Sequence, residues 1–439
     1  MKVLKFGGTS VGSIENIQNV KRIINDGEQK IVVLSAMSGT TNTLVLTANA
    51  IARKSLDLAT DTLNDLKEKY YSVIGSLFNN QALNEDVTRY VNSIFDGLLL
   101  CVSKSYSQDL ENQIVAQGEL MSTYMFNAYL KQEGVSAALL PALDFMRIDQ
   151  AKEPNLNYIK SHLKAVLSAA PEVDVYITQG FICLDDNDNI SNLQRGGSDY
   201  TATIIGAAIL AEEVQIWTDI DGMHNNDPRC VDGTTPISNL SFDEAAELAY
   251  FGAKILHPQT VTPVRADHIP VRLKNTMDPE AYGTLISSQT PDSGIKALAA
   301  KDGITAIKIN SGRMLQAHGF LKKVFEIFET YETSIDMITT SEVAVSLTID
   351  DDRNLDKILE ALNAIATIEV DANQSIICLV GQGIANHPDT FKLFKILQDV
   401  KIRMISYGGS NNNISLLVNS DDKIKTLRTL HGYLFEPVV

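Results

Sequence analysis

The sequence predicts an α/β protein in which a mostly parallel sheet lies between helices and two smaller α+β modules follow. Two features of the first part support this prediction: short apolar strands end in glycine-rich or polar turns, and each turn leads into a helix. A third feature, an internal repeat in the last third of the chain, predicts the two modules. The length of 439 residues is enough for two or three domains.

The first two strands lie close to the start of the chain. Val3–Phe6 is expected to be a strand, and a helix is expected from about residue 13 to 25. Residues 30–36 form a continuous apolar run of strand length, which is typical of a strand covered on both faces. The polar turn at 38–42 then leads into another helix. In sheets of this kind, ligands bind at the carboxyl ends of the strands.

The alternation continues through the rest of the first part. Residues 55–132 contain few Gly or Pro and are expected to be largely helical. Ser241 and Glu244 have the spacing of a capping box, which marks a helix start and contributes about 1 kcal/mol. Further elements are expected as a helix at 199–210 and as strands at 173–178, 214–218, 271–274 and 284–287.

The composition changes near residue 290, where residues 289–294 are typical of a linker. Beyond it, residues 323–328 (KVFEIF) align with 392–397 (KLFKIL), an offset of 69 residues. The same offset places Ser346 on Ser415 and Leu347 on Leu416 without a gap. We therefore predict one domain at 1–290 and two modules at 304–370 and 371–439.

Charge and composition exclude several classes of protein. The formal net charge of −17 argues against a nucleic-acid partner, because phosphate backbones are bound by basic faces. No stretch reaches the roughly 18 apolar residues of a membrane span, and Lys5 interrupts the apolar start of the chain, unlike in a signal peptide. The four cysteines are dispersed, and the seven histidines show no zinc spacing. These features predict a cytoplasmic protein with no membrane partner and no metal site of its own.

The first glycine-rich turn could bind a phosphate. Gly7 and Gly8 would let backbone N–H groups approach the anion, and the following helix would add the positive end of its dipole. Lys5, at the strand end, could reach the transferring oxygens. The turn is neither a Walker A loop nor a dinucleotide fingerprint, and from these residues alone an ordinary strand–helix turn is the alternative.

A second turn of this type lies at 195–199 (RGGSD). The guanidinium of Arg195 could bind a carboxylate with both arms, and Gly196 and Gly197 again permit close backbone approach. Asp199 opens a helix and could be only a cap. Two other parts of the sequence are weaker signals. A nucleotide could lie at the loop 217–229, and a solvated turn is the alternative. Glu119 could be only a charge on the surface of a helix.

Together these segments resemble the aspartokinases of the amino-acid-kinase superfamily. The resemblance covers about residues 2–288 and rests on seven segments in the family's order: KFGGTSV at 5–11, SAMSGTTN at 35–42, GELMS at 118–122, RGGSDYTA at 195–202, WTDIDG at 217–222, DPR at 227–229 and FGAKILHP at 251–258. It implies the amino-acid-kinase fold and ATP-dependent phosphorylation of the L-aspartate β-carboxylate to 4-phospho-L-aspartate, the first step toward lysine, threonine and methionine. A kinase of another amino-acid carboxylate, such as glutamate, and a non-catalytic amino-acid sensor are the alternatives.

The resemblance also implies roles for single residues. Lys5 would stabilise the transferring phosphoryl group, and Asp199 would orient Lys5. Aspartate would be bound by Thr41, Glu119, Arg195, Gly196, Gly197 and Ser198, with Arg195 holding the α-carboxylate and Glu119 the ammonium group. ATP would contact Lys5, Phe6, Gly7, Gly8, Thr218, Asp219, His224, Arg229, Lys254 and Ile255, with His224 at a position where relatives often carry tyrosine. Mg²⁺ would be carried by the ATP phosphates.

The repeated modules resemble ACT domains, ferredoxin-like units that bind small ligands. The resemblance to lysine-sensitive aspartokinases implies lysine as the effector, with threonine and the absence of any effector as the alternatives. The pocket would comprise Met314, Gly319, Phe320, Leu321, Asp336, Ser341 and Glu342, with Ala317 where related enzymes can carry serine. The second module would borrow the strand at 304–309, and pairing of the modules would give a homodimer or a dimer of dimers.

Overall fold

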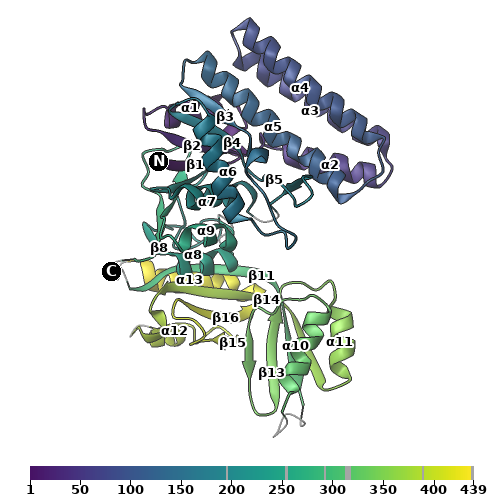
Figure 1. Cartoon of the computed structure of the whole chain (residues 1–439). Coiled ribbons are helices and arrows are strands. Elements are labelled where there is room, and N and C mark those ends of the chain that lie inside the picture. Colours follow the sequence, from purple (N-terminus) through teal and green to yellow (C-terminus); the bar gives the residue numbers. More distant parts are fainter. Residues whose placement is uncertain (194–195, 253–255, 291–292, 312–317, 388–389, 437–439) are drawn as a thin grey trace. The chain divides into compact units, whose positions relative to one another are not determined.

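The computed structural model describes residues 1–439 except 194–195, 253–255, 291–292, 312–317, 388–389 and 437–439 (Figure 1). The chain forms two compact units: Met1–Met223 with Leu256–Ser288, and His224–Ile255 with Gln289–Val439. The sequence predicted a boundary near residue 290. The structure in addition groups residues 224–255 with the C-terminal unit.

The first unit contains a mostly parallel sheet in the strand order β3-β4-β2-β1-β7-β9-β10. Only β10 runs antiparallel to its neighbour among these strands. The central strands are continuously or nearly continuously buried, as their apolar sequences predict. The strands are β1 (Lys2–Phe6), β2 (Lys30–Leu34), β3 (Ala137–Leu140), β4 (Val175–Gln179), β7 (Val214–Thr218), β9 (Val271–Asn275) and β10 (Thr284–Ser287).

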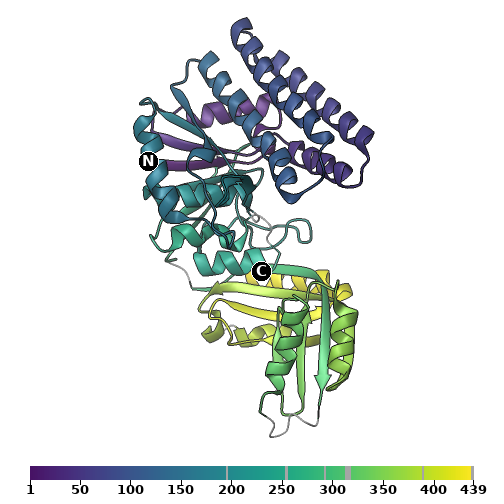
Figure 2. The ribbon, with the colours of Figure 1, turned by 45° about the vertical axis from the view of Figure 1, so that its right-hand side comes forward.

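Helices cover this sheet, and the helical region predicted at 55–132 is confirmed. The long helices α3 and α4 lie side by side, and α5 packs against α4 (Figures 1 and 2). A short hairpin of β5 (Ile182–Leu184) and β6 (Ile190–Asn192) precedes α7. The helices are α1 (Ile14–Ile24), α2 (Thr40–Ala52), α3 (Leu56–Leu77), α4 (Gln81–Val102), α5 (Gln108–Gln132), α6 (Leu156–Ala169), α7 (Gly197–Ile209) and α9 (Thr262–Arg265).

The side chains of β1 alternate between the two faces of the sheet. Leu4 and Phe6 lie in the core with Ile17 and Val20 of α1, whereas Lys5 reaches α7. Phe6 is in register with Leu34 of β2 and with Trp217 of β7. The carboxyl ends of these three parallel strands therefore meet at one edge, where the predicted turns lie.

The C-terminal unit is built on an antiparallel sheet in the order β12-β13-β11-β14-β16-β15. The internal repeat is confirmed, because β13 and β16 start 69 residues apart, at 344 and 413. The strands are β11 (Gly294–Asn310), β12 (Ile338–Thr340), β13 (Ala344–Ile349), β14 (Thr367–Gln382), β15 (Ile402–Ser406) and β16 (Asn413–Asn419).

Each half of this sheet has its own helices and its own core. One core contains Val324 of α10 and Leu362 of α11, and the other contains Leu393 of α12 and Leu427 of α13. Figure 1 shows the two helix pairs over different parts of the sheet. The helices are α10 (Phe320–Thr330), α11 (Leu355–Asn363), α12 (Thr390–Ile396) and α13 (Lys423–Phe435).

The strand that the second module borrows differs from the expected one. Residues 304–310 pair with β13 and with the first half of β14, whereas residues 294–301 pair with the second half of β14. The reason is that β11 is one strand of 17 residues that continues past a register shift between Lys301 and Ile304. A single strand thus serves both modules.

Segment 224–255 contains β8 (Asn239–Ser241) and α8 (Phe242–Tyr250). The predicted capping box is confirmed: Ser241 and Glu244 exchange side-chain-to-backbone hydrogen bonds. Glu244 also pairs with Lys296 of β11, and Glu247 accepts a hydrogen bond from Asn413 of β16. These contacts explain why α8 belongs to the C-terminal unit. Across the described ranges, no helix is both long enough and apolar enough to cross a membrane.

Candidate active site

An ion pair between Lys5 and Asp199 lies at the strand-end edge of the first sheet. Lys5 Nζ is 2.6 Å from Asp199 Oδ1, and the two side chains are only 12 % and 17 % exposed. Lys5 comes from β1, and Asp199 lies in the first turn of α7. The structure thus brings together the two residues predicted to be catalytic.

The turn after β1 needs glycine at position 8. A Cβ atom on Gly8 would lie 2.9 Å from the backbone oxygen of Ala36, because the loop after β2 packs closely on this turn. The Ser38 N–H donates to the Gly8 oxygen and fixes the approach. A Cβ atom on Gly7 would lie 3.4 Å from Lys5 Nζ, so the glycine turn lies directly beside the lysine ammonium group. The lysine ammonium and the glycine turn therefore form one cationic corner. Phe6 faces the core, so only its backbone can take part.

The second glycine turn starts α7. Gly196 and Gly197 have φ values of +69° and +33°, and a Cβ on Gly196 would lie 2.7 Å from Thr260 Oγ1. The Asp199 N–H donates to the Gly196 oxygen, which places the carboxylate above the turn. Arg195, predicted to hold the substrate carboxylate, lies outside the described residues.

A chain of hydroxyl groups joins three elements at this site. Ser35 Oγ donates to Ser198 Oγ at 3.0 Å, and Ser122 Oγ of α5 donates to the Ser35 backbone oxygen at 2.9 Å. Ser198, a predicted substrate residue, is buried. The sequence analysis did not select Ser35 or Ser122, although both lie inside segments that carry the family resemblance. The structure shows that they position the start of α7.

Glu119 is a buried carboxylate beside the loop after β2. Its side chain accepts a hydrogen bond from the Ala36 N–H at 3.2 Å through Oε1, and Oε2 has no partner among the described residues. Burial raises the pKa of Glu119 to about 8, against the opposing effect of the Ala36 N–H. A buried carboxylate with a free oxygen suits a cationic ligand. Thr41 lies nearby in the sequence of this loop, half-buried in the first turn of α2.

Lys69 is a cation that the sequence analysis did not single out. It reaches from α3 to the loop that precedes Thr41, and its ammonium group donates to the Ser38 backbone oxygen at 2.6 Å. Nothing in the sequence distinguishes it from the other charged residues of a long amphipathic helix.

The residues predicted to bind the nucleotide are divided between the two units. Thr218, at the end of β7, donates to Asp219 in the first unit. In the second unit, His224 contacts Thr234, and the guanidinium of Arg229 donates three hydrogen bonds to Asp227. Lys254 and Ile255 lie outside the described residues.

The predicted effector residues lie in the first half of the C-terminal sheet. Gly319, with φ of +87°, precedes α10, so Phe320 and Leu321 form the first turn of that helix. Ser341 caps the turn between β12 and β13 by accepting from the Ala344 N–H, and Glu342 is exposed in the same turn. Asp336 is ion-paired with Lys301 of β11, and the Tyr250 hydroxyl donates a hydrogen bond to the same carboxylate. Met314 and Ala317 lie outside the described residues.

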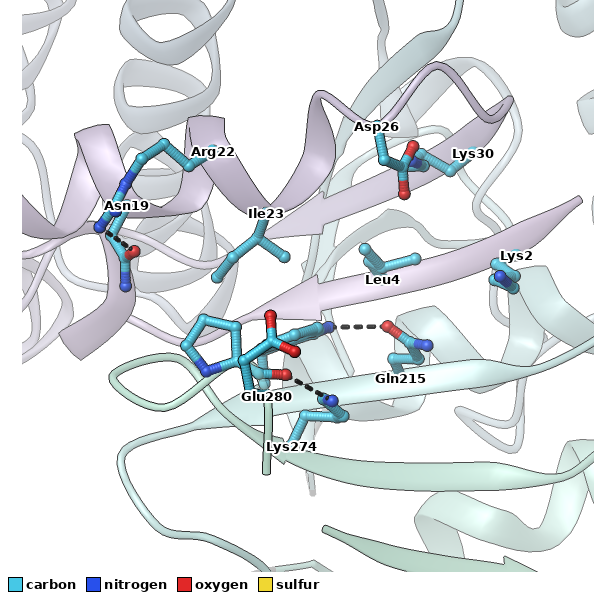
Figure 3. A pocket seen from close by; sticks show the side chains of 12 residues that line it. Lys2, Leu4, Asn19, Arg22, Ile23, Asp26, Lys30, Gln215, Lys274 and Glu280 are labelled. Atoms are coloured by element: carbon cyan, nitrogen blue, oxygen red, sulfur yellow. Dashed lines mark hydrogen bonds and ion pairs between the residues drawn. The ribbon is translucent and has the colours of Figure 1, made fainter. Parts of the chain in front are cut away.

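A separate cavity of about 420 Å³ lies on the α1 side of the first sheet (Figure 3). Lys2 and Leu4 line it, on the opposite side of β1 from Lys5. Its other charged groups are largely matched by the protein: Lys30 pairs with Asp26, and Lys274 donates to two backbone oxygens. None of the predicted site residues that the structure describes lines this cavity, and most of its polar groups are bound to other groups of the protein.

Comparisons with known proteins identify the family of this chain. The model of the amino acid kinase family matches residues 1–275, and a model of the ACT domain matches residues 377–434. The lysine-sensitive aspartokinase 3 of Escherichia coli K12 is 34 % identical over 450 residues, which cover 99 % of each chain. The chloroplastic aspartokinase 3 of Arabidopsis thaliana is also 34 % identical, over 99 % of this chain and 81 % of the relative.

Solved structures show the same similarity. E. coli aspartokinase III in complex with aspartate and ADP, in the R-state, superposes with a TM-score of 0.84 at 33 % identity and covers 99 % of this chain and 100 % of its own. The same enzyme with lysine and aspartate, in the T-state, gives 0.80 at 32 % identity, with the same coverage of both chains. The predicted order of an amino-acid-kinase domain followed by ACT-type modules is confirmed. The chain therefore belongs to the amino acid kinase family, and within that family it is an aspartokinase.

Proposed function

We propose that this chain transfers the γ-phosphoryl group of ATP to the β-carboxylate of L-aspartate and is inhibited by L-lysine. The observation that supports the reaction most directly is the Lys5–Asp199 pair between two glycine turns. Whole-length similarity to relatives named as aspartokinases supports the choice of substrate. In the proposed division of labour, residues 1–290 catalyse and the modules at 304–370 and 371–439 regulate.

The chemistry requires positioning and charge stabilisation rather than proton transfer. A carboxylate with a pKa of about 4 is already ionised at pH 7 and can attack without a general base. A carboxylate oxygen forms a bond to the γ-phosphorus, the bond from phosphorus to the bridging oxygen breaks, and ADP leaves with the electron pair. Lys5 stabilises the charge on the transferring oxygens, and Asp199 keeps its ammonium group in place.

The substrate aspartate has two groups that need recognition besides the reacting carboxylate. Its ammonium group binds Glu119, whose free buried oxygen is a suitable acceptor. Its α-carboxylate binds Arg195, and Ser198 and Thr41 hydrogen-bond the remaining oxygens.

ATP is the second substrate and brings Mg²⁺ with it. The Asp199 carboxylate at the cationic corner is paired with Lys5 and is not left free for a metal ion. Nor do the described parts of the chain contain a group of three or more His, Cys, Asp or Glu side chains that could hold a metal ion. This donor set fits a metal bound mainly through the nucleotide phosphates, which neutralises charge on the transferred group. Thr218, Asp219, His224, Arg229, Lys254 and Ile255 contact the nucleotide.

The regulatory part works as an assembly of two chains or more in this proposal. The terminal strands of the six-stranded sheet, β12 and β15, expose Ile338 and Ile405, and exposed apolar side chains favour association. The effector lysine binds in the first module, at the residues predicted from the sequence. The four cysteines are all free, which fits a protein of the reducing cytoplasm.

The test is formation of aspartyl phosphate, trapped as the hydroxamate, with ATP and Mg²⁺. L-glutamate replaces L-aspartate in a parallel reaction, and millimolar L-lysine or L-threonine is added to a third. Hydroxamate formed from aspartate and suppressed by lysine is the expected result. Formation from glutamate alone would reassign the substrate, and ATP binding without any product from folded protein would favour a non-catalytic sensor.

A further inference from the structure

Thr276, which directly follows β9, is fully buried and contacts three separate segments of the first unit. Its N–H donates to the Thr218 backbone oxygen at 2.8 Å, and its hydroxyl oxygen is 2.8 Å from the Ser10 hydroxyl oxygen. Its carbonyl oxygen accepts a hydrogen bond from the side-chain amide of Asn19. Thr276 therefore connects the end of β7, the turn after β1 and helix α1.

The hydroxyl contact fixes the turn that is expected to bind phosphate. Ser10 belongs to a short 3-10 helix, Thr9–Val11, that starts directly after Gly8. The Ser10 N–H donates to the Gly7 oxygen at 3.0 Å and closes the turn at 7–10. Ser10 is only 1 % exposed, so water cannot take the place of the Thr276 hydroxyl. The position of the turn thus depends on this buried hydrogen bond.

The backbone contact fixes Thr276 on the end of β7. In the parallel pairing of β7 with β9, Thr218 is in register with Asn275. The Thr276 N–H adds one more hydrogen bond to this ladder. The proposed function places Thr218 at the nucleotide. One residue therefore holds a nucleotide-binding strand end with its backbone and the phosphate turn with its side chain.

Asn19 makes the backbone of Thr276 independent of its hydroxyl. Arg22 donates to Asn19 Oδ1 at 2.6 Å (Figure 3), so the amide nitrogen of Asn19 is the end that faces the Thr276 oxygen. With both its N–H and its carbonyl oxygen bound, the Thr276 backbone has its own anchors on β7 and α1. Removal of the hydroxyl group alone should therefore free the turn without moving the strand end.

We propose that the Thr276 hydroxyl is a positioning group for ATP, which it provides by holding the phosphate turn at a fixed place relative to Thr218. The nucleotide then meets both contacts at once, and a misplacement of about 1 Å in such a site can cost about 10²-fold in rate. The groups proposed for aspartate, such as Glu119, do not depend on this hydrogen bond. The inference rests on the proposed function in one respect, the assignment of the turn and of Thr218 to ATP.

The experiment compares two substitutions of Thr276. Thr276→Val removes the hydroxyl and keeps the shape of the side chain, whereas Thr276→Ser keeps the hydroxyl and removes a methyl group. Binding of ADP with Mg²⁺ is measured by calorimetry, and hydroxamate formation gives the kinetic constants for both substrates. Thr276→Val should weaken ADP binding and lower kcat/KM for ATP by roughly 5-fold or more, as expected when a buried hydroxyl loses its partner. The KM for aspartate should stay within about twofold, and Thr276→Ser should be close to the wild type in all three measurements.

Ser10→Ala breaks the same hydrogen bond from the side of the turn, so the test does not depend on the folding of a single variant. If the two hydroxyls act through each other, the double variant should lose no more ADP affinity than the weaker of the two single variants. Thr178→Val is the matched control. Thr178 of β4 is also fully buried, but its hydroxyl has no partner among the described residues, so this variant should bind ADP as the wild type does.

The outcomes separate this inference from the proposed function. Folded Thr276→Val or Ser10→Ala protein that binds ADP as tightly as the wild type would overturn the inference. So would losses that multiply in the double variant, or a KM for aspartate that rises as much as that for ATP. A wild type that binds ADP but makes no aspartyl phosphate would overturn the proposed function instead. The ADP affinities would still decide the role of Thr276, because calorimetry needs no turnover.

Discussion

Replacing Lys5 by methionine removes the charge at the cationic corner and keeps most of the side-chain volume. One aimed donor to a developing negative charge is worth about 10²–10³ in kcat, or about 2.7–4 kcal/mol. The Lys5 ammonium group is largely shielded from water and lies 2.6 Å from its partner, so solvent cannot replace it. We expect Lys5→Met to lower kcat by at least about 10²-fold, with a smaller change in the KM for aspartate.

The same change also affects stability, and the two effects can be separated. Without Lys5, Asp199 is a poorly solvated carboxylate without a cation, which costs up to about 3 kcal/mol after allowance for its partial exposure. Adding Asp199→Asn removes that uncompensated charge. The double variant should recover most of the free energy of unfolding, measured by urea denaturation, and none of the activity.

The assay is hydroxamate formation at saturating ATP and aspartate, with Lys2→Met as the matched control. Lys2 lies on the same strand, faces the other side of the sheet, and pairs with the exposed Glu28. Exposed pairs contribute about 1 kcal/mol or less, so the control should remain active. A folded Lys5→Met enzyme within about threefold of the wild type would refute the role of Lys5 in charge stabilisation.

Three other predictions follow from the described contacts. Burial raises the Glu119 pKa to about 8, so the folded protein keeps a proton there that the unfolded chain releases above pH 4.5. The free energy of unfolding should therefore fall as the pH rises from 4.5 to about 8. Aspartate binding at pH 7 should release a proton from the wild type but not from Glu119→Gln. Calorimetry in buffers of different ionisation enthalpy measures that proton release. Ser241→Ala removes the α8 cap and should lower the free energy of unfolding by about 1 kcal/mol in urea titrations; no change would show that Glu244 holds the helix start alone. Gly252→Ala should strongly lower the melting temperature, because its Cβ would lie 2.2 Å from the Ala300 backbone oxygen. The control Gly97→Ala in α4, where nothing lies within 4 Å, should be neutral or stabilising. Equal effects of the two substitutions would contradict the close approach at residue 252.

The sequence predicts the parts of the site that local patterns encode. Lys5 and Asp199 each lie next to a glycine turn between a strand and a helix, and the parallel topology then brings the two turns together. The Ser35–Ser198 hydrogen bond is different, because its partners are 163 residues apart and either serine would fit many loops. Such pairs follow from tertiary packing and have no local signal.

The boundary between the two units could not be predicted from the sequence either, because it too depends on tertiary packing. Segment 224–255 resembles part of the kinase by its motifs, but Lys296 and Asn413 attach its helix to the C-terminal sheet. Likewise, the resemblance assigned Asp336 to a ligand, and only the coordinates reveal its internal partners Lys301 and Tyr250.

The strands β11 and β14 pair along nearly their whole length, from residue 294 to 310 on one and from 382 to 367 on the other. Both strands belong to both modules, so neither module can unfold without breaking backbone hydrogen bonds of the other. In native-state hydrogen exchange, the amides of the 295–301 and 304–310 stretches should therefore open with one shared free energy, as a single cooperative foldon. The repeat that appears in the sequence as two modules is therefore expected to unfold as one unit.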